Sequence, residues 1–205
     1  MRSSGGGGIL KGHRATLYFT TGNKGKYVEA ARIAATFGIN LRQVNRHKIE
    51  IQSDDLKEIA SFAAKEASQA TRRAVVADDS GFFLHAFGGF PGPYSSYVYK
   101  TIGNEGVLKL MRSVENRNGH FQSAVAFCKP AKEPVCFSAV VNGAVGRRAK
   151  GSFGFGFDPI FIPSDGDGRT FAQMNTDEKN LLSHRGRAFV KFFEWLTVQP
   201  KSILT

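Results

Sequence analysis

A glycine-containing segment near the N-terminus is the first part of this sequence that could do chemistry. It reads Thr20-Thr21-Gly22-Asn23-Lys24-Gly25-Lys26, and it lies between an apolar run and an amphipathic stretch. Backbone amides at the start of a helix attract anions, and the glycines allow a phosphate to approach the main chain. The P-loop pattern does not fit, because it requires Gly at position 20 and Ser or Thr at Tyr27. The segment is therefore either a phosphate site of another type or an ordinary strand-to-helix turn.

Two acidic segments could hold a divalent cation. Asp78-Asp79-Ser80-Gly81 follows the apolar run 74–77, and Mg2+ prefers one or two carboxylates together with substrate phosphates. Local sequence alone favours an acidic turn there, because Asp, Ser and Gly are common turn residues. The second candidate is Glu50, which would share a strand face with Gln52. A solvent-facing glutamate on an amphipathic strand is the simpler interpretation of Glu50.

Aromatic and basic residues gather in the last third of the chain. The run 151–159 alternates Gly and Phe and cannot form a well-packed helix, so it either presents rings to a nucleobase or forms a bulged core strand. Further on, Lys179 and Ser183 are four residues apart, which predicts that they share one face of a helix. Lys179 supplies a point charge for phosphate, and His184 and Arg185 supply hydrogen-bond donors. The alternatives are a cap or buried role for His184 and a surface role for Arg185.

The hydrophobic pattern predicts an α/β scaffold for these segments. We expect strands over 15–21, 41–49 and 74–77, with one helix after Lys26 and another capped by Ser53. A long Gly- and Pro-rich connection then leads to a helix near 104–113. Strands over 119–129 and 134–147 should form an antiparallel hairpin, and the last helical region should open at Thr176 or Asp177.

Composition narrows the class of protein. The 205 residues are 41% hydrophobic and 22% charged, which is typical of a globular protein, and no run approaches the roughly 20 apolar residues of a membrane span. Residues 1–14 contain four consecutive glycines and predict a flexible arm, which leaves 15–205 as one domain. The cysteines, Cys128 and Cys136, are too few for a disulfide framework and favour a reducing compartment.

The net charge of +11, from 28 basic and 17 acidic residues, indicates an anionic partner. Charge alone does not distinguish nucleic acid from small phosphate-bearing molecules. A nucleic-acid-binding module therefore remains a rival interpretation.

Seven segments, taken in the order in which they occur along the chain, resemble the inosine triphosphate pyrophosphatase family, also called XTP/dITP diphosphatases. They are TTGNKGK, IEIQ, DDSG, GGFPGPYSSY, FGFGFDPIF, TFAQM and EKNLLSHR, within about residues 15–197. The resemblance implies an elongated mixed β-sheet flanked by helices, in two lobes with the active-site cleft between them. It also implies a cytoplasmic homodimer that uses Mg2+, with Mn2+ as a substitute. Such an enzyme cleaves ITP, dITP and XTP between the α and β phosphates, releasing the monophosphate and pyrophosphate, and so clears deaminated purines. Nucleic acid would not be its main partner, and no membrane would be involved.

The resemblance also implies a role for each matching residue. Glu50 and Asp79 would bind the metal, and Asp79 would act as proton acceptor beside the catalytic Lys26. The substrate-binding residues would be Thr20, Thr21, Gly22, Asn23, Lys24, Lys26, Ser80, Phe155, Gly156, Phe157, Asp158, Lys179, Ser183, His184 and Arg185. The chain departs from the family pattern at Phe157, where Tyr or Trp is usual, at Ile49, where Pro is common, and at Ser96, where some relatives have Lys or Arg.

Overall fold

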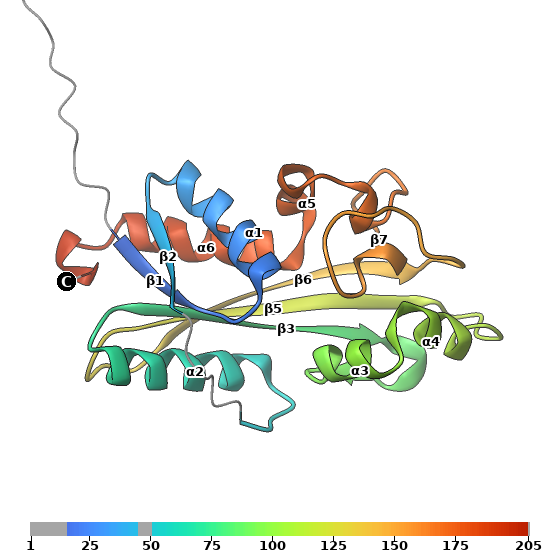
Figure 1. Cartoon of the computed structure of the whole chain (residues 1–205), viewed down its shortest axis with the longest axis horizontal. Coiled ribbons are helices and arrows are strands. Elements are labelled where there is room, and N and C mark those ends of the chain that lie inside the picture. Colours follow the sequence, from blue (N-terminus) through green and yellow to red (C-terminus); the bar gives the residue numbers. More distant parts are fainter. Residues whose placement is uncertain (1–15, 45–50, 205) are drawn as a thin grey trace, which may run out of the picture.

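A mixed seven-stranded sheet forms the centre of the molecule (Figure 1). The computed structural model describes residues 16–44 and 51–204. The strand order is β2-β1-β3-β5-β6-β7, and β4 pairs with β3 beside this path. Six α-helices flank the sheet in the described residues, so the predicted α/β class is confirmed.

The N-terminal half alternates strands and helices. Its elements are β1 (Thr16–Thr20), α1 (Lys24–Thr36), β2 (Asn40–Val44), α2 (Leu56–Thr71) and β3 (Val75–Leu84). β1 pairs in parallel with both β2 and β3. The predicted cap of α2 is wrong by two residues, because Asp55 accepts from the Lys57 amide while Ser53 accepts from the Asp55 amide.

The segment Asp78-Asp79-Ser80-Gly81 lies inside β3, so the predicted strand end and the acidic turn are both wrong. Antiparallel pairing with β5 (Asn118–Cys128) runs without a break from Val75↔Cys128 to Leu84↔Gly119. This long ladder overrides the turn preference of Asp, Ser and Gly, because each residue gains a cross-strand neighbour. The predicted hairpin is confirmed, with β5 paired to β6 (Val135–Val145).

The remaining strands and α-helices lie between residues 91 and 197. They are β4 (Pro91–Gly92), α3 (Ser95–Thr101), α4 (Gly103–Leu110), β7 (Phe161–Pro163), α5 (Thr176–Leu182) and α6 (His184–Thr197). Ser183 ends α5 and caps α6 by accepting from the Gly186 amide. The prediction that Lys179 and Ser183 share one helix face is therefore wrong.

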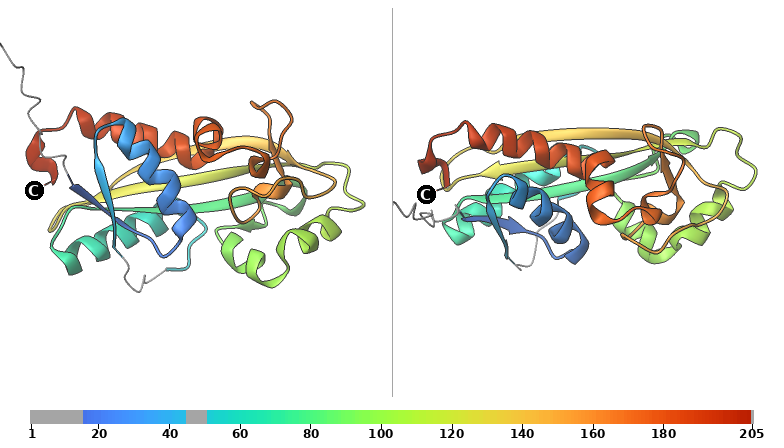
Figure 2. Two further views of the ribbon diagram at one scale, coloured as in Figure 1. Left: turned by 45° about the horizontal axis from the view of Figure 1, so that its top comes forward. Right: turned by 90° about the horizontal axis from the view of Figure 1, so that it is seen from above.

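Helices cover both faces of the sheet (Figures 1 and 2). Neighbouring residues of β3 therefore pack against different helices. On one face Val76 packs in a core with residues of α1 and α6, and on the other Ala77 packs with residues of α2. Because side chains alternate along a strand, Asp78 and Ser80 point to the α1–α6 face and Asp79 to the α2 face. A third core lies around Phe82, Phe121 and Phe161. Within the described part of the chain, no helix is both long and apolar enough to cross a membrane.

Candidate functional site

Two predicted segments meet where β1 ends. β1 pairs with β3 up to Ala77, and β4 pairs with β3 from Phe82, so residues 78–81 separate the two pairings on this edge. The start of α1 follows directly after β1. In open α/β sheets, ligands bind outside the carboxyl ends of strands such as β1. The topology therefore brings the glycine-containing segment and the acidic segment to one place.

The turn from β1 to α1 is held by local hydrogen bonds. The Asn23 side chain caps α1 by accepting from the Lys26 amide at 3.1 Å, and the Thr21 hydroxyl accepts from the Asn23 amide at 3.1 Å. Gln43 of β2 donates to the Thr21 carbonyl at 2.7 Å. Thr20 and Thr21 are buried, whereas residues 22–24 are exposed. The first turn of α1 contains no acidic residue, so the positive end of the helix dipole is not neutralised there.

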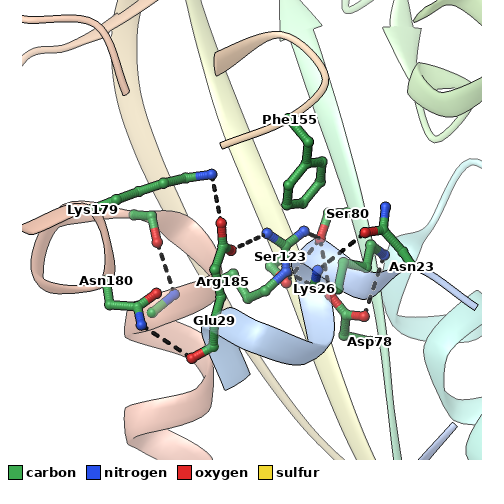
Figure 3. Close-up of polar contacts among 12 residues, drawn as sticks. Asn23, Lys26, Glu29, Asp78, Ser80, Ser123, Phe155, Lys179, Asn180 and Arg185 are labelled. Carbon is green, nitrogen blue, oxygen red and sulfur yellow. Dashed lines mark hydrogen bonds and ion pairs between the residues drawn. The ribbon is translucent and has the colours of Figure 1, made fainter. Parts of the chain in front are cut away.

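Glu29 of α1 is the centre of a buried ion network (Figure 3). Its carboxylate accepts from Lys179 Nζ at 2.7 Å and from Arg185 Nη1 at 2.6 Å. Lys179 also pairs with Asp158. The exposed fractions of Glu29, Lys179 and Arg185 are only 4%, 3% and 2%. Residues 150 positions apart in the chain are thus joined away from solvent.

Arg185 connects this network to β3. Its Nε donates to Asp78 Oδ2 at 2.9 Å, and its Nη2 donates to the Ser80 hydroxyl at 3.0 Å. Lys26 Nζ lies 3.3 Å from Asp78 Oδ1. Ser80 Oγ is also 3.1 Å from Ser123 Oγ on β5. The carboxylates of Glu29, Asp78 and Asp158 therefore face an equal number of cations: Lys26, Lys179 and Arg185.

The balance of burial and charge sets the protonation of these groups. Burial raises the pKa of Glu29, but the charges of Arg185 and Lys179 outweigh burial and hold that pKa below its ordinary value. Burial raises the pKa of Asp158, and the charge of Lys179 only partly offsets this. For Arg185, the carboxylates of Glu29 and Asp78 outweigh burial and raise the pKa, so the guanidinium stays charged.

Phe155 lies over the cations of this network. Lys179 Nζ is 4.9 Å and the Arg185 guanidinium carbon 5.3 Å from the centre of its ring. The ring also contacts Gly25, where an added Cβ would come within 2.3 Å of it. Asp158 fixes the backbone of this loop, because Oδ2 accepts from the Phe155 amide at 2.8 Å. The loop 151–157 contains no strand, so the alternative of a bulged core strand is wrong.

Phe157 does not present its ring to solvent as we expected of a base-stacking residue. It belongs to the third core, with ring centres 5.3 Å from Phe82 and 5.5 Å from Tyr99. Gly156 between the two phenylalanines has φ 62° and accepts from Asn104 through its carbonyl. This left-handed conformation favours glycine, and it lets Phe155 and Phe157 point to different surroundings.

His184 lies at the first position of α6 and is buried. Its ring stacks on Phe121, with 4.6 Å between centres and 8° between planes. Burial, followed by the charges of Arg185, Lys179 and Lys26, lowers the pKa of His184 well below its ordinary value, so the imidazole is neutral. Among the described residues, Nδ1 has no hydrogen-bond partner. This buried nitrogen can therefore donate to or accept from a ligand.

Known proteins resemble this chain in sequence and in fold. The family model described as the Ham1 family matches residues 17–195. The chain belongs to the Ham1 family. It is 46% identical over 179 residues to a protein of Methanopyrus kandleri named dITP/XTP pyrophosphatase, covering 87% of this chain and 95% of the relative. The chain is also 47% identical to the protein of the same name from Saccharolobus solfataricus, over 86% of this chain and 91% of the relative.

Solved Ham1 structures have the same fold. The Ham1 protein of Staphylococcus aureus matches with a TM-score of 0.76 at 26% identity, over 89% of this chain and 98% of that one. A HAM1 protein of Coxiella burnetii matches with the same TM-score and identity, over 90% and 99%. The resemblance that the seven segments carry in the sequence is confirmed.

For this Ham1 chain, the predicted metal ligands are only partly described. Asp79 lies on the α2 face of β3, and Glu50 lies outside the described residues. No group of three or more His, Cys, Asp and Glu side chains that could hold a metal ion occurs in the part of the chain that the structure describes. Mg2+ does not need one, because it usually takes one or two protein carboxylates and keeps waters or phosphates as its other ligands. Within the described residues, Asp79 supplies one such carboxylate, whereas Glu29, Asp78 and Asp158 already balance buried cations.

Sequence reasoning missed Glu29, Ser123 and Asn180. Asn180 donates to the Glu29 carbonyl at 3.0 Å. Ser123 donates to the Asp79 carbonyl, which ties β5 to the acidic segment. A signal for Glu29 does exist, because it lies four residues before Ile33 on the buried face of α1. A carboxylate on an apolar helix face requires a buried partner.

Proposed function

We propose that this protein hydrolyses ITP, dITP and XTP between the α and β phosphates, releasing the nucleoside monophosphate and pyrophosphate. The names of the 46–47% identical relatives support this substrate class. The observation that carries the proposal is the meeting of the α1 N-terminus and Lys26 with residues 78–81 of β3. This arrangement places donors for a polyphosphate beside a carboxylate segment.

Phosphate binding falls to the start of α1. The backbone amides of residues 22–24 and the Lys26 ammonium bind phosphate oxygens and stabilise the charge that develops during cleavage. Asp79 accepts the proton of the attacking water. Asp79 and Glu50 would hold a Mg2+ ion, for which Mn2+ could substitute. When bound, the cation supplies positive charge that neutralises phosphate oxygens.

Arg185, His184 and Phe155 select the base. Hypoxanthine and xanthine carry a carbonyl acceptor at position 6, whereas adenine carries an amino donor there. Arg185 donates to the carbonyl, and so does His184 in the neutral tautomer that carries its proton on Nδ1. Phe155 stacks on the purine ring. Adenine would leave these donors unpaired, which costs about 1–3 kcal/mol for each buried group.

The protein acts as a homodimer in the cytoplasm under this proposal. Exposed aromatic side chains on and beside α3, at Tyr94, Tyr97 and Tyr99, support association with a second copy. Both cysteines are free, which is consistent with a reducing compartment.

The test is pyrophosphate release from ITP, dITP, XTP and the four standard triphosphates, with and without Mg2+. We expect kcat/KM for ITP to exceed that for ATP about 5- to 150-fold for each donor left unpaired. The variant Asp79→Asn should remain folded and lose turnover, whereas Asp177→Asn, at an exposed side chain of α5, should behave as wild type. Equal rates for ITP and ATP, near-normal turnover of Asp79→Asn, or nucleic-acid binding without hydrolysis would each refute the proposal.

A further inference from the structure

A basic pocket lies at the end of the sheet where β5 begins and β6 ends. Its volume is about 250 Å³, and it is lined by Leu108 and Lys109 of α4, by Arg112 and Arg117 before β5, and by Arg147 after β6. None of these residues belongs to the candidate active site. Four of the five carry a positive charge.

Arg117 is a fixed part of this pocket. Its Nε donates to the Val145 carbonyl at 2.8 Å, its Nη2 to the Gly146 carbonyl at 2.8 Å, and its Nη1 to the Met111 carbonyl. These bonds use three of the five N–H groups of the guanidinium and hold the planar head in place. The remaining two N–H groups are available to a ligand without further ordering of the side chain.

The positive charges of the pocket are not balanced by protein carboxylates. No acidic residue lines the pocket, and within residues 16–44 and 51–204 none of its four cations makes an ion pair. Burial, and then the nearby charge of Arg147, lower the pKa of Arg117. The folded protein therefore holds like charges together, a cost that an anion in the pocket would relieve.

We propose that this pocket is a binding site for a diphosphate group, separate from the active site. A single phosphate group carries about 1.5–2 negative charges at neutral pH, which leaves about two of the four positive charges unmatched, and a diphosphate carries more. The arginines supply planar donor pairs that suit phosphate oxygens. Free pyrophosphate and the diphosphate of a nucleotide share this chemistry.

The shape and lining favour a small anion over a nucleic acid. Sites for single-stranded nucleic acid combine a basic track with aromatic side chains on which bases stack. Here the cations surround one hollow, and among the described residues Leu108 is the only apolar side chain that lines it.

The test is calorimetric titration of the full-length protein with inorganic pyrophosphate, without divalent metal and at low salt. The exposed pair Arg112→Gln/Arg147→Gln should lose one binding event per chain or weaken it about tenfold or more, because hydrogen bonds to charged groups are the stronger ones. Pyrophosphate bound at the active site cancels in this comparison, since no lining residue is shared. Lys109→Gln, which removes another of the lining cations, replaces the double variant if that variant fails to fold.

The control is Arg72→Asn/Lys132→Gln, which removes the same charge at the other end of the sheet and should bind as wild type. A nucleoside diphosphate that binds as tightly as pyrophosphate identifies a nucleotide as the source, and weaker binding identifies free pyrophosphate. The proposal is overturned if the pocket variant titrates as wild type or the control loses as much. It also fails if inorganic phosphate binds equally well, or if a ten-nucleotide thymidylate binds more tightly.

Discussion

At the scale of single residues, Glu29 does most to organise the candidate site. It bridges Lys179 and Arg185, and Arg185 in turn holds Asp78 and Ser80. These side chains come from α1, α5, α6 and β3, so one carboxylate links four elements. An ion network with so little exposure is sensitive to the loss of one member, because the remaining charges stay buried.

Glu29→Gln should therefore lower the free energy of unfolding by about 3–5 kcal/mol, the usual effect of removing one partner of a buried ion pair. Urea denaturation at pH 7.5 measures the change. The matched control is Asp177→Asn, which breaks an exposed ion pair of 2.7 Å with Arg32. It should cost about 0–1 kcal/mol. A loss below about 1 kcal/mol in Glu29→Gln would show that the network does not stabilise the fold.

Glu29 and Phe157 show what the sequence could and could not predict at this scale. The segments that hold Lys26, Asp78, Ser80 and Arg185 were recognisable from their residue types. The partners of Glu29 lie about 150 residues away, and no local pattern encodes such a distance. Phe155 and Phe157 look equivalent in the sequence, and only the backbone conformation of Gly156 separates them.

At the scale of elements, β3 and the hairpin are the informative comparison. The hairpin was predictable because two long runs of strand-forming residues flank a short turn bounded by Pro130 and Pro134. The length of β3 was underestimated because residues 78–81 are all turn-forming types. Long-range pairing with β5 decides the conformation of this segment. The predicted strand 41–49 falls partly on residues 45–50, which lie outside the described residues, and β2 covers 40–44.

The packing of α1 against the aromatic loop allows a test at this scale. Gly25→Ala would push a Cβ into the Phe155 ring and displace it from the cations. Under the proposed function, KM for ITP should rise, because stacking of a base on an aromatic ring contributes about 1–3 kcal/mol. The melting temperature should not fall, since Ala favours a helix more than Gly does.

Phe155→Ala provides the comparison for that experiment. It should raise KM at least as much, and the double variant should be no worse than Phe155→Ala alone, because both changes act through one ring. An unchanged KM in Gly25→Ala, or additive effects of the two changes, would contradict the inferred contact.

At the scale of the whole molecule, the candidate site does not explain the net charge of +11. Its buried carboxylates and cations balance, so the excess lies elsewhere, in part around the pocket lined by Arg117. The site also holds a neutral imidazole beside three cations, because burial and those positive charges lower the pKa of His184. The energy of keeping His184 uncharged then appears in the pH dependence of folding.

Stability should therefore fall as the pH drops below about 6.5, the usual pKa of histidine in an unfolded chain. The unfolded state binds a proton there while folded His184 does not, because its pKa is well below the ordinary value. Each such histidine contributes a slope of about 1.4 kcal/mol per pH unit. His120, whose pKa is lowered by burial and by His85, adds to the same slope.

His184→Phe should remove the contribution of one histidine to the slope of the unfolding free energy against pH between pH 6.5 and 5. Urea denaturation at steps of half a pH unit measures this slope. Above about pH 8 both imidazoles are almost entirely neutral in either state, so the difference between variant and wild type should stay constant there. A wild-type slope retained in His184→Phe would mean that His184 takes up its proton in the folded protein.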